Sequence, residues 1–153
     1  MSSMPGFVLS LIDQPTQADI STLYSWITDY NLAQVGDHWK GRLTVLARDR
    51  FGHLAGGISG FTDRDWLRIE VLVVQEQVRH QEIGAQLLEA AEAEARRRGC
   101  HSAWLDTFSF QALPFYEAHG YVVFGALEQY PGTHTRYFVR KSLTGQESGS
   151  VSP

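Results

Sequence analysis

The sequence predicts an α/β (α+β) domain built on one mixed sheet, in which most neighbouring strands are antiparallel. Three observations predict this class. Short apolar runs alternate with amphipathic helical stretches along the chain. Near the middle, a strand, a long helix and a second strand follow one another, and this order makes a parallel pair through a right-handed crossover. Hairpins predicted on either side of that unit make the rest of the sheet antiparallel.

The first part of the chain predicts one short strand and one helix. Residues 7–12 form an apolar run before a proline and suit a strand. Thr16 and Asp19 have the spacing of a capping box. Apolar residues then recur at helical spacing to about Tyr30. Residues 31–41 contain two glycines, and we expect a loop or a broken helix there.

The strands of the sheet are predicted from apolar or alternating runs that are bounded by turn residues. Residues 66–74 form the strongest of these runs, and their nearly continuous apolar end is typical of a buried strand. Residues 49–52 supply a turn that joins two other strands as a hairpin. The expected strands are 43–47, 53–61, 66–74, 103–107, 121–127 and 136–140.

Residues 82–98 predict the longest helix. Their apolar residues form one stripe, and glutamates come first and arginines last, which is the order that the helix dipole favours. Gly99 is the expected stop. A shorter helix is predicted over 111–119, and it must start near residue 111 because Pro114 is tolerated only in a first helical turn.

Composition excludes several classes of protein. The 153 residues suit one domain, which we expect over 1–143, followed by a flexible polar tail over 144–153. The net charge of −4 disfavours nucleic acid as a partner. The single cysteine, Cys100, is expected in the core, and no Cys/His spacing predicts a metal site. No apolar run approaches the roughly 20 residues of a membrane span, so we expect a cytoplasmic protein without a membrane partner. We expect it to be a monomer or a homodimer.

The junction between the strongest strand and the longest helix carries the first functional signal. Free N–H groups at a helix N-terminus form an anion site. Gly84 and Ala85 are small enough to let a ligand approach the backbone there, and Arg79 and His80 stand beside them. A plain strand–helix turn, whose glycine merely eases packing, is the alternative on this feature alone.

Two motifs in this region point to a family. Residues 79–84 read Arg-His-Gln-Glu-Ile-Gly after an apolar strand end. Residues 109–121 contain Ala112, Tyr116 and Gly120 at fixed spacing. Together with the order of strands and helices over most of the chain, these motifs resemble those of the GNAT superfamily of acyl-CoA-dependent N-acetyltransferases.

This chain departs from the family patterns at three positions. In the first pattern, Q/R-x-x-G-x-G/A, Glu82 replaces the middle glycine. In the second, N-x-x-A-x-x-x-Y-x-x-x-G-F, Ser109 replaces the asparagine and Tyr121 the final phenylalanine. Glu82 would place a carboxylate near a bound pyrophosphate. We therefore expect Glu82→Gly to tighten acetyl-CoA binding by a few-fold while slightly destabilising the free protein.

The resemblance implies a fold and a cosubstrate. It implies an N-acetyltransferase domain with helices on both faces of the sheet and with its two parallel strands splayed apart to admit acetyl-CoA. Val73 and Val74 would offer backbone groups to the pantetheine arm, and the loop and helix start after them would hold the pyrophosphate. The cofactor-binding residues so implied are Val73, Val74, Arg79, His80, Gln81, Glu82, Ile83, Gly84, Ala85, Ser109 and Ala112.

Direct attack of an amine on the thioester needs two proton transfers and no covalent enzyme intermediate. Tyr116 matches the family's tyrosine that protonates the departing CoA thiolate; the alternative is an apolar-face residue packed beside Leu113. Glu70 could take the proton of the amine, directly or through a water. The alternative for Glu70 is a half-exposed carboxylate that pairs with Arg68 or another neighbour.

The resemblance places the acceptor pocket between the segment after the first helix and the loop that joins the last two strands. Carboxylates and aromatic rings there could hold a cationic amine, and ordinary solvated loops are the alternative. Two histidines of these segments are further candidates for the base. The residues concerned are Asp37, His38, Trp39, Tyr130 and His134.

The sequence therefore predicts an enzyme that moves an acetyl group from acetyl-CoA to an amine of a small molecule or peptide. The competing hypothesis is a binding module of the same fold that senses acyl-CoA with little or no catalysis. The replacements at Glu82 and Ser109 favour the sensor, whereas Tyr116 and Arg79 favour the enzyme.

Overall fold

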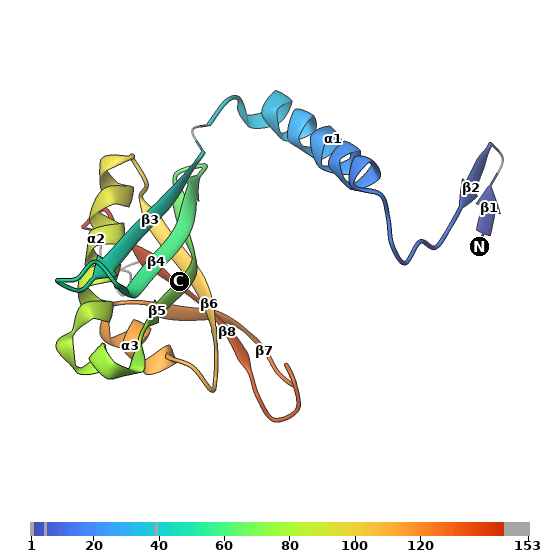
Figure 1. Cartoon of the computed structure of the whole chain (residues 1–153). Helices are drawn as coiled ribbons and strands as arrows, with labels where there is room; N and C mark the ends of the chain where they lie inside the picture. Colours follow the sequence, from blue (N-terminus) through green and yellow to red (C-terminus); the bar gives the residue numbers. More distant parts are fainter. Residues whose placement is uncertain (1, 5, 39, 146–153) are drawn as a thin grey trace. The chain divides into compact units, whose positions relative to one another are not determined.

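A computed structural model describes residues 2–4, 6–38 and 40–145 of the chain (Figure 1). The chain divides into two compact units, residues 1–37 and 38–153, which are described separately. The single domain over 1–143 stays a prediction. The predicted tail lies outside the described residues from position 146 onward.

The first unit begins with a small antiparallel sheet of two strands, β1 (Ser2–Met4) and β2 (Phe7–Leu9). The strand predicted over 7–12 is therefore present in shortened form, and it pairs with a strand that the sequence did not indicate.

The helix of the first unit, α1 (Gln17–Val35), starts where the capping box predicts. The Thr16 side-chain oxygen accepts a hydrogen bond from the Asp19 N–H at 3.1 Å and so satisfies one of the free N–H groups of the first turn. The helix continues five residues past the predicted end at Tyr30 and stops before Gly36, whose φ of 78° suits a glycine.

The second unit is built on one six-stranded sheet with the order β3-β4-β5-β6-β8-β7 (Figure 1). All neighbours are antiparallel except β5 and β6, which are parallel, so the predicted mixed, mostly antiparallel sheet is confirmed. Helices on both faces stay a prediction, because α1 belongs to the other unit. The strands are β3 (Gly41–Arg48), β4 (Leu54–Asp63), β5 (Trp66–Val74), β6 (Ser102–Phe108), β7 (Val122–Leu127) and β8 (Arg136–Ser142).

The two parallel strands remain paired over only a short length. Trp66–Arg68 of β5 pair with Ser102–Trp104 of β6, and the pairing then stops. The ladder between β4 and β5 has a bulge just beyond this point: Gly60 faces Ile69, and Glu70 is the extra residue. A bulge bends its strand and increases its local twist, and this directs the end of β5 away from β6.

Three helical segments accompany the sheet: η1 (Glu76–Gln81), α2 (Ile83–Arg97) and α3 (Leu113–Ala118). The η1 turn occupies the connection between the strand predicted over 66–74 and the helix predicted over 82–98. The helix predicted over 82–98 is confirmed within one residue at each end, and α3 contains Pro114 in its first turn, as expected.

The core lies between α2 and the sheet. The predicted apolar stripe of α2 is buried against β3, β4 and β5. Cys100 is buried in the same cluster, as expected, and burial raises the pKa of its thiol. The largest fully buried apolar side chains of the core are Leu43, Ile58, Leu67, Leu88, Leu105, Val139 and Leu143.

A buried carboxylate ties α2 to the far end of the sheet. Glu92 accepts hydrogen bonds from the Tyr121 hydroxyl at 2.8 Å and from Lys141 Nζ at 2.9 Å. Buried charges are stable only when they are paired and hydrogen-bonded, and this network meets that requirement. It fixes α2 against β8 and against the residue that precedes β7.

Neither α1 nor any other described helix is long and apolar enough to cross a membrane. Within the same described residues, no three side chains of His, Cys, Asp or Glu gather in an arrangement that could hold a metal ion.

Gly60 is required by the close approach of β5. A Cβ added at Gly60 would lie 1.9 Å from the Arg68 carbonyl oxygen, which belongs to the backbone and cannot turn away. Gly60→Ala is therefore expected to lower the free energy of unfolding by about 2–4 kcal/mol, measured by urea denaturation. Gly125→Ala is the control, because a Cβ added at Gly125 would lie at an ordinary 3.8 Å from its nearest neighbour, Phe138 Cβ. This control should change the free energy of unfolding by less than about 1 kcal/mol. Equal effects of the two substitutions would contradict this account of the bulge.

Candidate functional site

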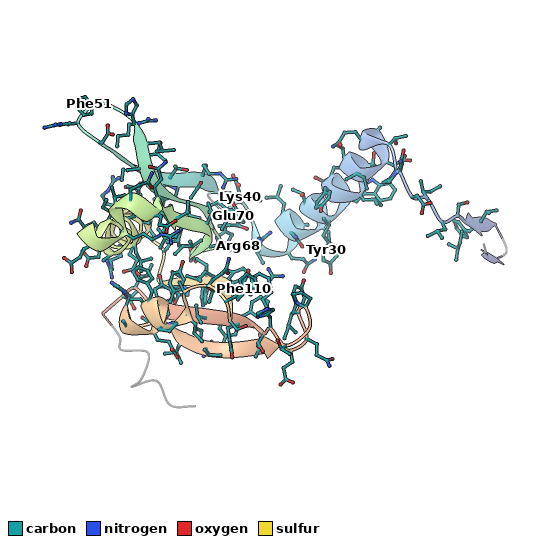
Figure 2. The ribbon with its side chains drawn as sticks, turned by 60° about the horizontal axis from the view of Figure 1, so that its bottom comes forward. Tyr30, Lys40, Phe51, Arg68, Glu70 and Phe110 are labelled. Carbon is teal, nitrogen blue, oxygen red and sulfur yellow. The ribbon has the colours of Figure 1, made fainter. Side chains whose placement is uncertain are left out.

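The separation of β5 from β6 opens two adjoining cavities of about 570 and 500 Å³. The larger one lies between the splayed strands, and the smaller one extends toward the start of α2. Glu70 and Phe110, which line the larger cavity from β5 and from the segment after β6, are labelled in Figure 2. Six residues line both cavities: Leu72, Val73, Val74, Arg79, Ala112 and Tyr116.

The free edge of β5 supplies backbone groups to these cavities. The Gln75 N–H donates to the Ala55 carbonyl of the neighbouring segment at 2.8 Å. Hydrogen-bonded pairs recur at every second residue of an antiparallel ladder, so Val73 directs its backbone groups to β4. Leu72 and Val74 direct theirs to the open edge. Part of an extended amide-rich ligand could therefore pair with this edge as an additional strand.

The N-terminus of α2 faces the smaller cavity with its backbone N–H groups free of a side-chain cap. Such a terminus attracts anions. Gly84 and Ala85 of the first turn line the cavity without large side chains. Arg79 adds a positive charge beside it, and its Nε donates to the Val74 carbonyl at 3.1 Å. This hydrogen bond holds the guanidinium where β5 ends.

Glu82 sits in a left-handed conformation between η1 and α2, with φ 57° and ψ 23°. A residue with a side chain adopts this region at a cost of about 1–2 kcal/mol. The position that is glycine in the family pattern is therefore one where the backbone itself favours glycine. This conformation argues against the expectation that Glu82→Gly destabilises the free protein, because that expectation did not include the strained backbone.

Tyr116 presents an unpaired hydroxyl to both cavities. Its side chain is almost entirely buried, at 6% exposed. No described residue forms a hydrogen bond with its hydroxyl, and the described part of the chain has no fully enclosed side-chain oxygen without a partner. The hydroxyl is therefore accessible from the cavity. Burial raises the pKa of Tyr116 to about 12, so the side chain is protonated throughout the neutral range.

The ring of Tyr116 is held in place from two sides. Phe115 and Tyr121 meet it edge-on, with centroids 5.2 and 5.8 Å away. Tyr121 is itself fixed by its hydrogen bond to the buried Glu92. Burial, followed by the adjoining Glu92 carboxylate, raises the pKa of Tyr121, so this second tyrosine is a structural donor and stays protonated.

Glu70 lies at the bulge of β5 and lines the larger cavity. Its Oε1 accepts a hydrogen bond from Arg42 Nη1 at 2.5 Å, so its partner is Arg42 of β3 and not Arg68. Arg42 also donates to the Gly60 carbonyl. Arg68 instead lies over the rings of Phe61 and Trp104. The predicted alternative, a carboxylate paired with a neighbour, thus describes the contact that Glu70 makes.

Asp106 faces the same cavity from β6, and no motif in the sequence indicated it. Its Oδ1 accepts a hydrogen bond from Arg136 Nε at 2.7 Å, and this hydrogen bond raises the pKa of the Arg136 guanidinium. A carboxylate inside the otherwise uncharged strand predicted over 103–107 was the available signal. It becomes informative only once β6 is known to border a cavity.

Aromatic side chains form the rim on the β6 side. Phe110 lines the larger cavity, stacks on Phe108 with centroids 5.1 Å apart, and meets the His134 ring edge-on at 4.9 Å. Ser109 joins the two segments of this rim, because its Oγ accepts from the Thr135 N–H at 3.0 Å. The structure thus brings Tyr130 and His134 to the rim, although neither lines a cavity.

The predicted site residues fall into four groups. Those on β5, at the start of α2 and on α3 border the cavities or adjoin residues that do. Ser109, Tyr130 and His134 form the rim, His38 is exposed beyond the cavities, and Asp37 ends the other unit. Trp39 and the side chains of His80 and Gln81 lie outside the described part of the chain. Gln111, which the sequence analysis passed over, lines the larger cavity.

Comparison with known proteins agrees with this geometry. The profile described as "Acetyltransferase (GNAT) family" matches residues 9–121. An acetyltransferase of Agrobacterium fabrum is 42% identical over 98 residues, or 64% of this chain and 72% of that protein. The blasticidin-S acetyltransferase of Streptomyces morookaense is 36% identical over 93 residues, or 60% of this chain and 68% of that protein. The crystal structure of an acetyltransferase from Bacillus cereus matches with a TM-score of 0.81 and 32% identity, covering 87% of this chain and 97% of that one.

The chain belongs to the GNAT family of acetyltransferases. It is an acyltransferase, and acetyl-CoA is the acetyl donor of this family. The described residues fit that molecule. The uncapped start of α2 and the Arg79 guanidinium suit its pyrophosphate. The open edge of β5 suits its amide-rich arm, and the cavity between β5 and β6 is lined by Tyr116.

The strain at Glu82 predicts the outcome of replacing it. Glu82→Gly should relieve the left-handed conformation and raise the free energy of unfolding by up to about 1 kcal/mol, because glycine's greater freedom in the unfolded chain offsets part of the gain. Glu82→Ala is the control, since it removes the carboxylate but keeps the strained backbone. Urea denaturation should rank glycine above alanine. Calorimetry then measures acetyl-CoA binding by both variants. If binding tightens equally in both, the Glu82 charge is what weakens binding in the wild type. If binding tightens in the glycine variant alone, the backbone conformation is the cause.

The raised pKa of Tyr116 predicts a loss of stability in alkali. In the unfolded chain a tyrosine releases its proton near pH 10, whereas native Tyr116 keeps it to about 12. The unfolded state therefore binds fewer protons between these values, and native stability falls as pH rises. Tyr116→Phe should reduce this slope by up to about 1.4 kcal/mol per pH unit, measured by urea unfolding from pH 9 to 11. Identical slopes for the two proteins would show that the hydroxyl is not shielded.

Proposed function

We propose that this acetyltransferase transfers the acetyl group of acetyl-CoA directly to an amine of a small molecule. The observation that carries the proposal is the Tyr116 hydroxyl, which is protonated, unpaired and exposed to both cavities. A small-molecule acceptor is favoured over a peptide because one relative is a blasticidin-S acetyltransferase.

The chain binds acetyl-CoA through main-chain groups. The N–H groups of residues 80–85 and the Arg79 guanidinium hold the pyrophosphate, with Ile83 starting the helix. Gly84 lines the smaller cavity and has no side chain to fill it, so a ligand can approach its backbone. Leu72, Val73 and Val74 border the arm, and Ala112 lies where the arm passes α3. Ser109 supports the adjoining rim.

Glu70 prepares the acceptor for attack. An aliphatic amine is largely protonated at neutral pH, so its proton must leave before the nitrogen lone pair is available. Glu70 accepts that proton, directly or through a water. The nitrogen then forms a bond to the thioester carbonyl carbon, and the π electron pair of the carbonyl moves to its oxygen. As the carbonyl re-forms, the carbon–sulfur bond breaks and its electron pair stays on sulfur. The nitrogen is positively charged after the attack and gives up a second proton, which neutralises the thiolate, so CoA leaves as a thiol. Arg42 keeps the Glu70 side chain at the rim of the cavity while this occurs.

Tyr116 stabilises the departing sulfur. A thiol has an ordinary pKa of about 8.5, which lies below the value of about 12 for Tyr116 in the protein alone. Complete proton transfer from tyrosine to thiolate is therefore uphill, and the principal contribution of Tyr116 is a hydrogen bond to the sulfur as charge develops on it. Such a bond in a water-poor site is stronger in the transition state than in the ground state.

The remaining assignments stay predictions. These are side-chain roles for His80 and Gln81 at the pyrophosphate, and roles for Asp37, His38, Trp39, Tyr130 and His134 at the acceptor. A cytoplasmic location and a monomeric or dimeric state also belong with them.

Amine-dependent release of CoA tests the proposal against the acyl-CoA sensor. Acetyl-CoA is mixed with the protein and a panel of small amines, and free thiol is followed over time. The enzyme should release CoA at a rate that depends on the amine. The sensor should bind acetyl-CoA, with stabilisation of about 2.7 kcal/mol at 100 times the dissociation constant, but release no thiol with any amine.

The same assay tests Tyr116. Tyr116→Phe should lower kcat by about 10²-fold, because a hydrogen bond to a charged group is removed from the transition state. Acetyl-CoA affinity should change little, since the ring remains. Tyr137→Phe is the matched control: Tyr137 lies on β8 and lines neither cavity, so the loss of its hydroxyl should leave kcat nearly unchanged. Unaltered turnover in Tyr116→Phe would return Tyr116 to a packing role.

A further inference from the structure

Asp106 has one carboxylate oxygen fixed and one available. Oδ1 accepts the hydrogen bond from Arg136 Nε at 2.7 Å. Oδ2 accepts no hydrogen bond from any described residue, and Asp106 lines the larger cavity. Only 17% of its side chain is exposed. A ligand in this cavity therefore meets a charged oxygen that has little contact with bulk water.

The partner of Asp106 is itself braced. Arg136 Nη1 donates to the Tyr130 hydroxyl at 3.1 Å. Its guanidinium lies 5.3–5.4 Å from the ring centres of Phe108, Tyr130 and Phe138. Since Arg136 can move little, the direction of the Asp106 carboxylate is set before a ligand arrives. A preorganised group loses little conformational freedom on binding.

Phe110 adds an aromatic surface to the same cavity. Phe110 is 57% exposed, and its ring stacks on that of Phe108. The face of an aromatic ring attracts cations. A carboxylate oxygen together with such a ring is an environment that favours a protonated amine or a guanidinium over a neutral group.

The other charged side chains nearby are already engaged. Glu70 is bound by Arg42 and is more exposed than Asp106, at 38% of its side chain. Arg68 lies over Phe61 and Trp104. Glu70 and Asp106 follow the last paired residues of β5 and β6, so they flank the opening from opposite strands. One carboxylate can thus serve the reacting amine while the other binds a second group.

We propose that Asp106 is a specificity-determining residue, which binds a second cationic group of the acceptor with its free oxygen while Phe110 covers that group. The acceptor class is accordingly a small molecule with at least two basic groups, of which one is acetylated. This inference rests on the proposed transfer to an amine and adds the requirement for a second cation.

Matched amines test the proposal. The probes are 1,4-diaminobutane and 1,6-diaminohexane, each compared with the monoamine of equal length, butylamine or hexylamine. Two quantities are measured for each: kcat/KM from thiol release, and the dissociation constant from calorimetric titration of the protein saturated with CoA. The wild-type protein should prefer the better diamine to its monoamine by about tenfold or more, the range for a hydrogen bond between charged groups.

Three variants locate the preference. Asp106→Asn keeps the shape and an acceptor for Arg136 but removes the charge, and it should reduce the preference to within about threefold. Asp63→Asn is the control, because Asp63 also pairs with an arginine, Arg64, but lines neither cavity. Phe110 is exposed, so Phe110→Leu should preserve folding. It removes the aromatic face and should weaken diamine binding by a few-fold.

The outcomes separate this inference from the proposed function. A wild-type protein that treats diamine and monoamine alike, or a preference that survives in Asp106→Asn, overturns the role of Asp106. If no amine releases thiol, the transfer proposal fails, and the calorimetric preference still decides whether Asp106 binds the second cation. Should Asp106→Asn fail to fold, judged by its melting temperature with CoA, the comparison of Phe110→Leu with the wild type decides in its place.

Discussion

The backbone of β5 ceases to pair with β6 after Arg68, and every part of the site depends on this break. Unpaired N–H and C=O groups inside a sheet are costly unless another group satisfies them. The bulge at Glu70 and the close approach permitted by Gly60 hold the two strands apart, so the free edge is maintained in the protein alone. An extended ligand can then complete the sheet, and the energy of its main-chain hydrogen bonds becomes available for binding.

The splay also determines where chemistry can occur. It lets α3 place a tyrosine at the inner end of the opening, where burial keeps the hydroxyl protonated. On the two strands beyond the last paired residues it leaves two carboxylates, Glu70 and Asp106, each held by an arginine from another strand. The pair of Asp106 and Arg136 is less exposed than the pair of Glu70 and Arg42, and its arginine is also held by aromatic rings. It therefore contributes more to stability, because exposed ion pairs contribute little.

Strain and stability are distributed unevenly around the site. Glu82 occupies a left-handed conformation at the point where the chain enters α2, whereas the middle of α2 is held by the buried contacts of Glu92 with Tyr121 and Lys141. Strained backbone persists only where surrounding structure determines it. Here η1 and the long helix α2 impose the conformation, and α2 is in turn anchored by Glu92.

The sequence by itself determined the order of the six strands of the sheet and of helices α2 and α3, the parallel crossover, and the helix start beside Arg79, because these depend on local periodicity and on spacing along the chain. Only the tertiary structure decided that Arg42 is the partner of Glu70, that Asp106 faces the cavity, that Ser109 joins two segments of the rim, and that Glu82 is left-handed. Contacts between strands depend on register, and a single bulge changes which side chains meet. A residue such as Asp106 therefore acquires its role from a neighbour 30 positions away, Arg136, and no local pattern encodes that distance.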